Sequence, residues 1–167
     1  LIVTALADAA AAADALTLSE AHGTGTALGD PIEAGSLAGA LLASRGTSLA
    51  PLSVGGVKAN IGHAEPAAGM TGLLRLVVGL SSGMAAPNAQ LRVLNPHLRG
   101  AMVGTGCALA TSVGALGELQ PRVGSMSSFG YSGTIAHAVM QFDPIESVPA
   151  VPLVLTFTRR AFLWKEQ

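Results

Sequence analysis

The sequence predicts an α/β layered domain. Segments with helical periodicity alternate along the chain with short apolar segments typical of strands, which is the order expected when helices pack on a sheet. The chain has 167 residues, of which 50% are hydrophobic and 11% charged, so it can bury a core and is not disordered. Either this is a well-packed domain rich in alanine and glycine, or part of its apolar surface packs against another piece of protein.

The first element is expected to be a helix over residues 1–13, where alanine and leucine predominate. Residues 16–21 then predict a short strand that leads into a glycine-rich loop. The chain begins inside the helical pattern, without a methionine or the charged start of a signal peptide. We therefore expect it to be part of a longer reading frame or the product of a cut.

The second helix has a strong start signal. Asp30 is expected to be its N-cap, Pro31 suits the first turn, and Glu33 stands at N3, as in a capping box. This helix should end near residue 43, before Gly46. Capping is sufficient to explain both carboxylates, so we do not expect them to act as an acid–base pair.

The rest of the chain continues the alternation. We expect a helix over residues 66–80 and strands over residues 52–55, 102–110, 123–127 and 134–142, with loops at 56–63 and 128–133 and an extended connection over 87–96. Residues 143–167 contain three prolines near their start and are expected to form a linker or tail.

Composition excludes several classes of function. The net charge of −1, without a basic stripe, excludes a nucleic-acid-binding surface. No apolar run approaches the roughly 20 residues of a membrane span, since residues 73–80 are too short and contain Arg75. The single cysteine, Cys107, excludes an intramolecular disulfide and favours a reducing compartment such as the cytoplasm or a plastid.

Four motifs follow one another along the chain: EAHGTGT at 20–26, GDPIEA at 29–34, KANIGH at 58–63 and SSFGYSGT at 127–134. Together they resemble the C-terminal half of the ketosynthase (β-ketoacyl synthase) domains of polyketide and fatty-acid synthases, which are members of the thiolase superfamily. The resemblance covers residues 1–142 and implies the C-terminal half of a thiolase-like layered α/β/α/β/α fold. It also implies that residues 143–167 are a post-ketosynthase linker.

The resemblance implies a decarboxylative Claisen condensation between an acyl thioester and a malonyl-carrier protein. Negative charge then grows on a thioester oxygen, where hydrogen-bond donors stabilise the transition state. By resemblance His22 and His63 are the donors, and Lys58 holds the loop of the second histidine and tunes the charge of the site. A lysine with a lowered pKa that transfers protons is the alternative. Two donors on one oxygen must lie within roughly 6 Å of each other.

Four further residues are expected to bind substrate: Thr24, Thr26, Phe129 and Tyr131. The threonines would contact the local backbone or a pantetheine arm, and Tyr131 stands where the family usually has a phenylalanine that gates the acyl pocket. Neither a metal nor a directly bound cofactor is expected, because the phosphopantetheine arm of an acyl carrier protein carries the substrate. His97 and His137 are expected to have no chemical role.

The nucleophile of the family is a cysteine in the other half of the fold, and this chain lacks that motif. Cys107 lies in a predicted strand, where neither a base nor a helix N-terminus would activate it, so we do not expect it to be catalytic. The expected partners are a cysteine-bearing N-terminal half, on the same or a separate chain, and an acyl carrier protein, within a homodimer of the full domain. The alternatives are a non-catalytic scaffold subunit derived from a ketosynthase, and a thiolase, although the final loop lacks the cysteine that a thiolase needs.

Overall fold

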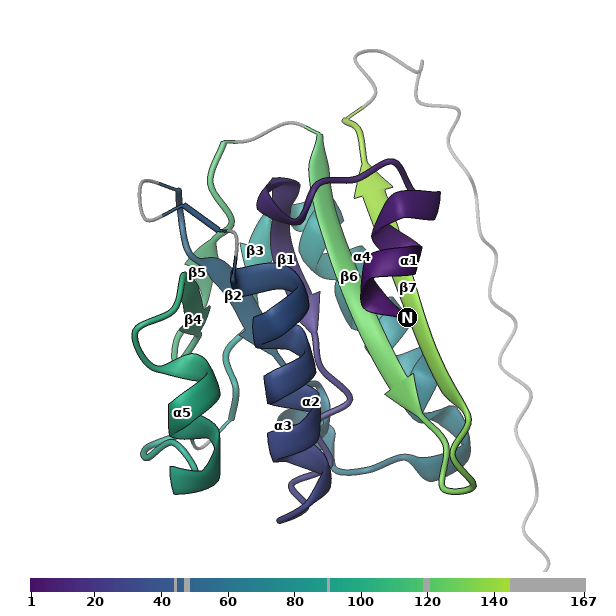
Figure 1. Cartoon of the computed structure of the whole chain (residues 1–167). Coiled ribbons are helices and arrows are strands. Elements are labelled where there is room, and N and C mark those ends of the chain that lie inside the picture. Colours follow the sequence, from purple (N-terminus) through teal and green to yellow (C-terminus); the bar gives the residue numbers. More distant parts are fainter. Residues whose placement is uncertain (44, 47–48, 90, 119–120, 145–167) are drawn as a thin grey trace, which may run out of the picture.

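The computed structural model describes residues 1–43, 45–46, 49–89, 91–118 and 121–144. A five-stranded sheet forms its centre, with strands in the order β4-β2-β1-β6-β7 (Figure 1). The first four of these are parallel and the last runs antiparallel to β6: β1 (Leu16–Glu20), β2 (Leu52–Gly55), β4 (Cys107–Leu109), β6 (Arg122–Phe129) and β7 (Ile135–Phe142). A separate antiparallel pair consists of β3 (Met84–Ala85) and β5 (Gly114–Ala115). The predicted α/β class is confirmed.

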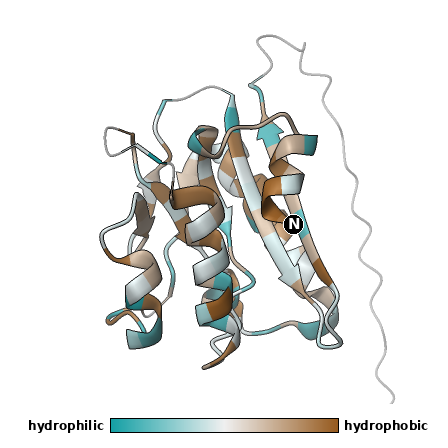
Figure 2. Cartoon of the chain, in the orientation of Figure 1, coloured by the Kyte–Doolittle hydropathy of each residue, from teal (hydrophilic) through white to brown (hydrophobic). Residues whose placement is uncertain are grey.

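Helices cover both faces of the sheet (Figure 1). On one face lie α1 (Ile2–Asp8), α2 (Gly29–Leu37) and α5 (Arg99–Met102), and on the other α4 (Ala68–Ser82). Side chains alternate along the central strand, so Leu16 joins the core under α1 and α2 while Leu18 joins the core under α4. Apolar residues accordingly recur on the helices and along the strands between them (Figure 2).

Helix α4 approaches the sheet closely. Its buried residues follow helical spacing: Ala68, Gly72, Leu76, Gly79 and Leu80. A Cβ at Gly79 would lie 2.5 Å from Cδ2 of Leu18, and a Cβ at Gly124 of β6 would lie 2.7 Å from Cδ1 of Leu76. These contacts show that glycine on both surfaces allows the helix to pack this near. The helix ends at Gly83, whose φ of 70° is left-handed, as in many helix C-termini.

The first helix is shorter than predicted. It ends at Asp8, because Ala10 adopts a left-handed φ of 49° and the Ala11 N–H donates to the Leu6 carbonyl at 2.9 Å. This bond pattern is that of a Schellman termination, in which glycine is usual. Helix propensity alone gave no sign of it, and the chain then enters β1 through a 3₁₀ turn at Ala13–Ala15.

The strand predicted over residues 102–110 was also too long. Asn95 accepts a bond from the His97 N–H at 3.0 Å and starts a 3₁₀ turn, Pro96–Leu98, which continues into α5 as far as Met102. Within the predicted range only Cys107–Leu109 forms a strand. The other predicted elements are present within one to three residues, with a π-helical turn at Ala38–Leu42 and a 3₁₀ turn at Glu65–Ala67 in addition.

The predicted loop at residues 56–63 contains a helical turn, α3 (Lys58–Ile61). The proposed linker lies almost wholly outside the described residues. Within the part of the chain that the structure describes, no helix has the length and apolarity to cross a membrane.

Candidate active site

The two histidines of the motifs lie at one edge of the sheet. In parallel strands Glu20 pairs with Gly55, so β1 and β2 end side by side. The loop after β1 carries His22, and the segment after β2 carries Lys58 and His63. The centroids of the two imidazole rings are 5.8 Å apart and their planes are perpendicular. The predicted convergence of the rings is confirmed.

A buried carboxylate from α2 holds the His22 loop. One oxygen of Glu33 accepts from the His22 N–H at 2.6 Å, and the other accepts from the Gly23 N–H at 2.9 Å. Gly23 has a φ of 49°, which lets both N–H groups turn toward the same side chain. Burial raises the pKa of the Glu33 carboxyl, and the two backbone bonds oppose that rise.

The predicted capping of α2 is wrong. The N-cap is Leu28, and Asp30 lies inside the helix, where its Oδ1 accepts from the N–H groups of Gly25 (3.1 Å) and Thr26 (3.3 Å). The helix start is instead satisfied by the Thr26 hydroxyl, which accepts from the Gly29 N–H at 3.0 Å. Both carboxylates of the GDPIEA motif therefore hold the preceding loop, since its free N–H groups lie within their reach.

The hydrogen bonds of the two histidines assign the same tautomer to both rings. Nδ1 of His22 accepts from the Phe129 N–H at 3.3 Å, and Nδ1 of His63 accepts from the Glu65 N–H at 3.3 Å. A neutral imidazole that accepts at Nδ1 carries its proton on Nε2. Each ring therefore retains an Nε2–H that can donate to a ligand.

His22 is held in its neutral form. Its side chain is buried, and burial, followed by the positive charge of Lys58, lowers its pKa to about 4 from the usual 6.5. His63 is exposed, so the site opens on that side. The Phe129 ring lies 5.2 Å from that of His22 and forms part of its surroundings.

Lys58 begins α3 and is half-buried. Burial lowers the pKa of its ammonium group, while the carboxylates of Glu20 and Glu33 act in the opposite direction. Lys58 thus lies in the field of two buried carboxylates that approach from different elements, β1 and α2.

Sequence reasoning missed two residues that support this site. Glu20, 1% exposed, accepts from the Val57 N–H at 2.6 Å and forms an ion pair with Arg75 of α4. Asn88 accepts from the Gly56 N–H at 3.0 Å and donates to the carbonyls of Val54 and Ala110. A carboxylate at the end of an apolar strand was a signal for Glu20, whereas nothing in the pattern distinguishes Asn88.

The remaining candidates are more dispersed. Thr24 is half-buried and its hydroxyl lies 3.5 Å from that of Thr26, which is exposed. Tyr131 is fully exposed, in the turn between β6 and β7. His97 is exposed, and His137 bonds Ser127 at 3.0 Å within the sheet.

Cys107 lies at the wrong end of the sheet to act with the histidines. It pairs with Leu52, the first residue of β2, whereas the imidazoles follow the last residues of β1 and β2. The length of β2 alone places its two ends about 10 Å apart. Its sulfur contacts the Thr105 hydroxyl and the Met102 carbonyl.

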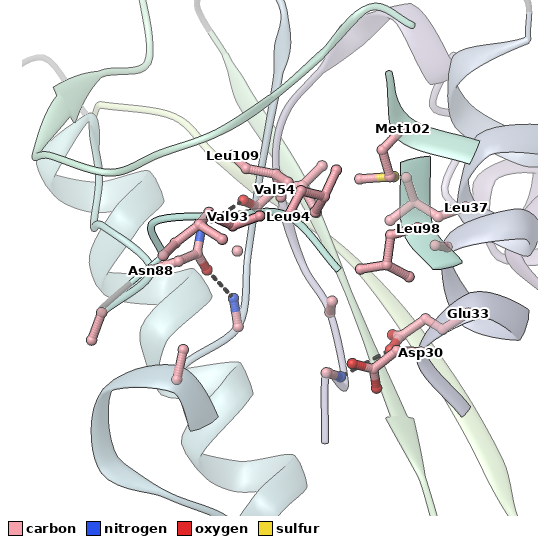
Figure 3. Close-up of a pocket in the computed structure, with 18 of the residues that line it drawn as sticks. Asp30, Glu33, Leu37, Val54, Asn88, Val93, Leu94, Leu98, Met102 and Leu109 are labelled. Carbon is pink, nitrogen blue, oxygen red and sulfur yellow. Dashed lines mark hydrogen bonds between the residues drawn. The ribbon is translucent and has the colours of Figure 1, made fainter. Parts of the chain in front are cut away.

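An apolar cavity of about 430 Å³ adjoins the His22 loop on the α2 face (Figure 3). Asp30 and Glu33 lie at one end and Asn88 at another, while aliphatic side chains such as Leu37, Leu98 and Leu109 line the rest. No group of three or more His, Cys, Asp or Glu side chains among the described residues is arranged to hold a metal ion.

Residues 1–92 match the family described as "Beta-ketoacyl synthase, C-terminal domain". The chain is 40% identical over 131 residues to the highly reducing polyketide synthase azaB of Aspergillus niger, covering 78% of this chain and 5% of that protein. It is 41% identical over 125 residues to the erythronolide synthase EryA3 of Saccharopolyspora erythraea, covering 75% of this chain and 4% of that protein. The chain thus spans about a twentieth of the curated relatives it matches.

Among solved structures, the chain is similar to the oxazolomycin ketosynthase domain OzmH KS7 of Streptomyces albus JA3453. The TM-score is 0.74 at 36% sequence identity, covering 89% of this chain and 26% of that one. Ketosynthase twelve of the bacillaene polyketide synthase of Bacillus amyloliquefaciens gives a TM-score of 0.72 at 34% identity, covering 81% of this chain and 24% of that one. These likenesses confirm the thiolase-like fold that the motifs imply.

Proposed function

The chain belongs to the β-ketoacyl synthase family, whose C-terminal domain it matches, and we propose that it supplies the histidine pair of a condensing site in polyketide synthesis. The observation that carries the proposal is the arrangement of the two imidazoles. They lie 5.8 Å apart, and each uses Nδ1 as an acceptor for a backbone N–H, so both keep Nε2–H for substrate. Lys58 is the third member of this site and favours the neutral form of His22 by its charge.

The proposed reaction begins with decarboxylation of a malonyl thioester. The bond between the carboxylate and the α-carbon breaks, CO₂ leaves, and the electron pair forms an enolate whose charge lies on the thioester oxygen. The Nε2–H groups of His22 and His63 donate to that oxygen. Neutral donors suit this task, because they stabilise the charge as it develops without first transferring a proton.

The second step joins two carbon atoms. The α-carbon attacks the carbonyl of an acyl group held on a cysteine thiol, the new C–C bond forms, and the C–S bond to the cysteine breaks with release of thiolate. In our proposal a cysteine-bearing N-terminal half supplies this thiol. We further propose that the malonyl group arrives on the phosphopantetheine arm of an acyl carrier protein, passing Thr24 and Thr26.

An apolar surface on α4 and the last residue of α3 supports this assembly, and we call it the α4 surface. It consists of four side chains that are each 56% to 62% exposed: Ile61, Met70, Leu74 and Val78. A shallow apolar cavity of about 440 Å³ runs along it toward β3. Ile61 is exposed and stands two residues before the exposed His63, so the chain links this surface directly to the segment that carries the second histidine. The related ketosynthase chain is about four times as long as the part this chain matches, which favours the rest of such a domain as the occupant.

The test uses the assembled ketosynthase, in which this chain and the cysteine-bearing half are present together. We expect His22→Ala and His63→Ala each to reduce malonyl decarboxylation and condensation on the order of a hundredfold or more, as removal of an oxyanion donor does elsewhere. Acylation of the cysteine and assembly of the two halves should persist. His97→Ala, which removes an exposed histidine in the Pro96–Leu98 turn, is the matched control.

A scaffold subunit would behave differently. If the two histidine variants condense substrate at the rate of the wild type, or if they lose only assembly with the partner, the catalytic proposal fails and the scaffold role is favoured.

A further inference from the structure

We propose that Glu20, through its ion pair with Arg75, is a positioning residue that fixes the segment carrying Lys58 and His63. This inference rests on the proposed function, because it concerns the same site. It assigns a role to a charged pair to which the resemblance gave none, since Glu20 only opens the EAHGTGT motif and Arg75 lies outside all four motifs.

The contacts of Glu20 place it at the root of that segment. Its Oε1 accepts from the N–H of Val57 at 2.6 Å, and Val57 is the N-cap of α3. Its Oε2 pairs with Nη1 of Arg75, whose Nη2 donates to the Ala86 carbonyl at 2.9 Å. The carboxylate thus joins three parts of the chain: the end of β1, the start of α3, and α4.

A helix of one turn depends on its anchors for its orientation, because it has few hydrogen bonds of its own. In α3 the anchors are the Val57 N–H on Glu20 and the Asn60 side chain, which donates to the Pro87 carbonyl at 3.1 Å. Lys58 is the first residue of this turn, and His63 follows its last residue by two. Displacement of Val57 would therefore move both functional side chains.

The surroundings leave the ion pair little freedom. A Cβ on Gly55 would lie 2.6 Å from Nη1 of Arg75, and a Cβ on Gly72 would lie 3.5 Å from Cγ of Glu20. Gly55 therefore leaves the space through which the Arg75 guanidinium crosses β2. Such close enclosure fixes the direction of the carboxylate, which is what a positioning residue requires.

The charge of Glu20 acts on the same segment. The groups that face Lys58 are Glu20 from β1, Glu33 from α2 and His22 from the loop between them. Burial lowers the pKa of Lys58, and both carboxylates oppose this effect. Loss of the Glu20 charge would lower the pKa of Lys58 further, so Lys58 would lose its proton at a lower pH than in the wild type.

The experiment replaces Glu20 by glutamine in the assembled ketosynthase. Glu20→Gln keeps an oxygen for the Val57 N–H but removes the charge. We expect the kcat of malonyl decarboxylation to fall ten- to a hundredfold, on the order seen when a reacting group is misplaced by about 1 Å. The alkaline limb of the pH–rate profile should move to lower pH. Acylation of the partner cysteine should be unchanged.

Two further variants separate positioning from loss of stability. Glu20→Gln leaves the partly buried Arg75 without a counter-charge, so the double variant Glu20→Gln/Arg75→Met removes both charges together. It should fold and still show the displaced alkaline limb. Arg45→Met is the control. This buried arginine donates to the carbonyls of Ala13 and Ala50, near the N-terminal ends of β1 and β2 and away from the histidines. Its loss should lower stability and leave the pH–rate profile unchanged.

The outcomes distinguish the two proposals. If the double variant folds and keeps both the wild-type kcat and the wild-type pH profile, the positioning role is refuted, while inactive His22→Ala and His63→Ala variants would still support the proposed function. If those histidine variants remain active, the proposed function falls regardless of the result at Glu20.

Discussion

Leu74 gives the sharpest test of the α4 surface. Its side chain is 56% exposed, whereas Leu76, two residues away on the same helix, is fully buried. Complete burial of a leucine side chain contributes about 1.5–3 kcal/mol, so covering the exposed part of Leu74 would contribute about 1–1.5 kcal/mol. Leu74→Ala should therefore weaken association with the cysteine-bearing half about tenfold.

A charge at this position should have a larger effect. Leu74→Asp loses the same apolar contact and also buries a carboxylate without a partner, which costs several kcal/mol more. We expect the dissociation constant to rise by at least about a hundredfold. The assay is co-expression of the two halves with a tag on one of them, followed by affinity purification and sedimentation to determine the dissociation constant.

The matched control is Val103→Asp. Val103 is 65% exposed, but it follows α5, which packs on the opposite face of the sheet with α2. This variant should bind the partner as the wild type does. Equal binding by Leu74→Asp and the wild type would mean that α4 does not form the interface, and the route by which the thiol reaches the histidines would need a different explanation.

Three further predictions concern the core and the site. Leu76→Ala should lower the free energy of unfolding of the assembled domain by about 2–5 kcal/mol in urea titrations, because Leu76 is fully buried between α4 and the sheet; a loss below 1 kcal/mol would contradict that packing. Gly124→Ala should destabilise the domain by about 1–3 kcal/mol or more, since the new Cβ would lie 2.9 Å from the Leu18 carbonyl; an unchanged unfolding midpoint would refute the contact. His22 should titrate by NMR near its lowered pKa of about 4. Because the unfolded chain binds this proton more readily, the free energy of unfolding should fall as pH decreases from about 6.5 toward 4. An imidazole that titrates near 6.5 would contradict the burial of His22.

The sequence predicted correctly those helices and strands whose buried faces are set by residues close together in the chain. The spacing of Ala68, Gly72, Leu76 and Leu80 gives α4 a buried stripe, and the apolar strand Leu16–Glu20 forms the centre of the sheet. The first helix was too long in the prediction because its end depends on one residue, Ala10, in a conformation that alanine rarely adopts. The π-helical turn after α2 likewise has no local signal.

The site could be predicted only where its residues lie in recognisable motifs. His22, Lys58 and His63 were identified in this way, and the structure brings the two rings together. The roles of Asp30 and Glu33 were misassigned because a helix start and a loop anchor require the same residues at the same spacing, and only the positions of the acceptor atoms distinguish the two. The pair of Glu20 and Arg75, 55 residues apart, depends on how α4 lies on the sheet.

The carboxylates of Glu33 and Asp30 bind four backbone N–H groups of the His22 loop within this one polypeptide. The loop is therefore already organised by bonds that form when the chain folds, rather than by bonds to a second protein. The loop loses its conformational entropy when the chain folds, so docking of a partner carries little further entropic cost for ordering it. Encounter of the two halves would then be a rigid-body event at this edge, with association rates set by diffusion and surface fit rather than by slow ordering of the histidine loop.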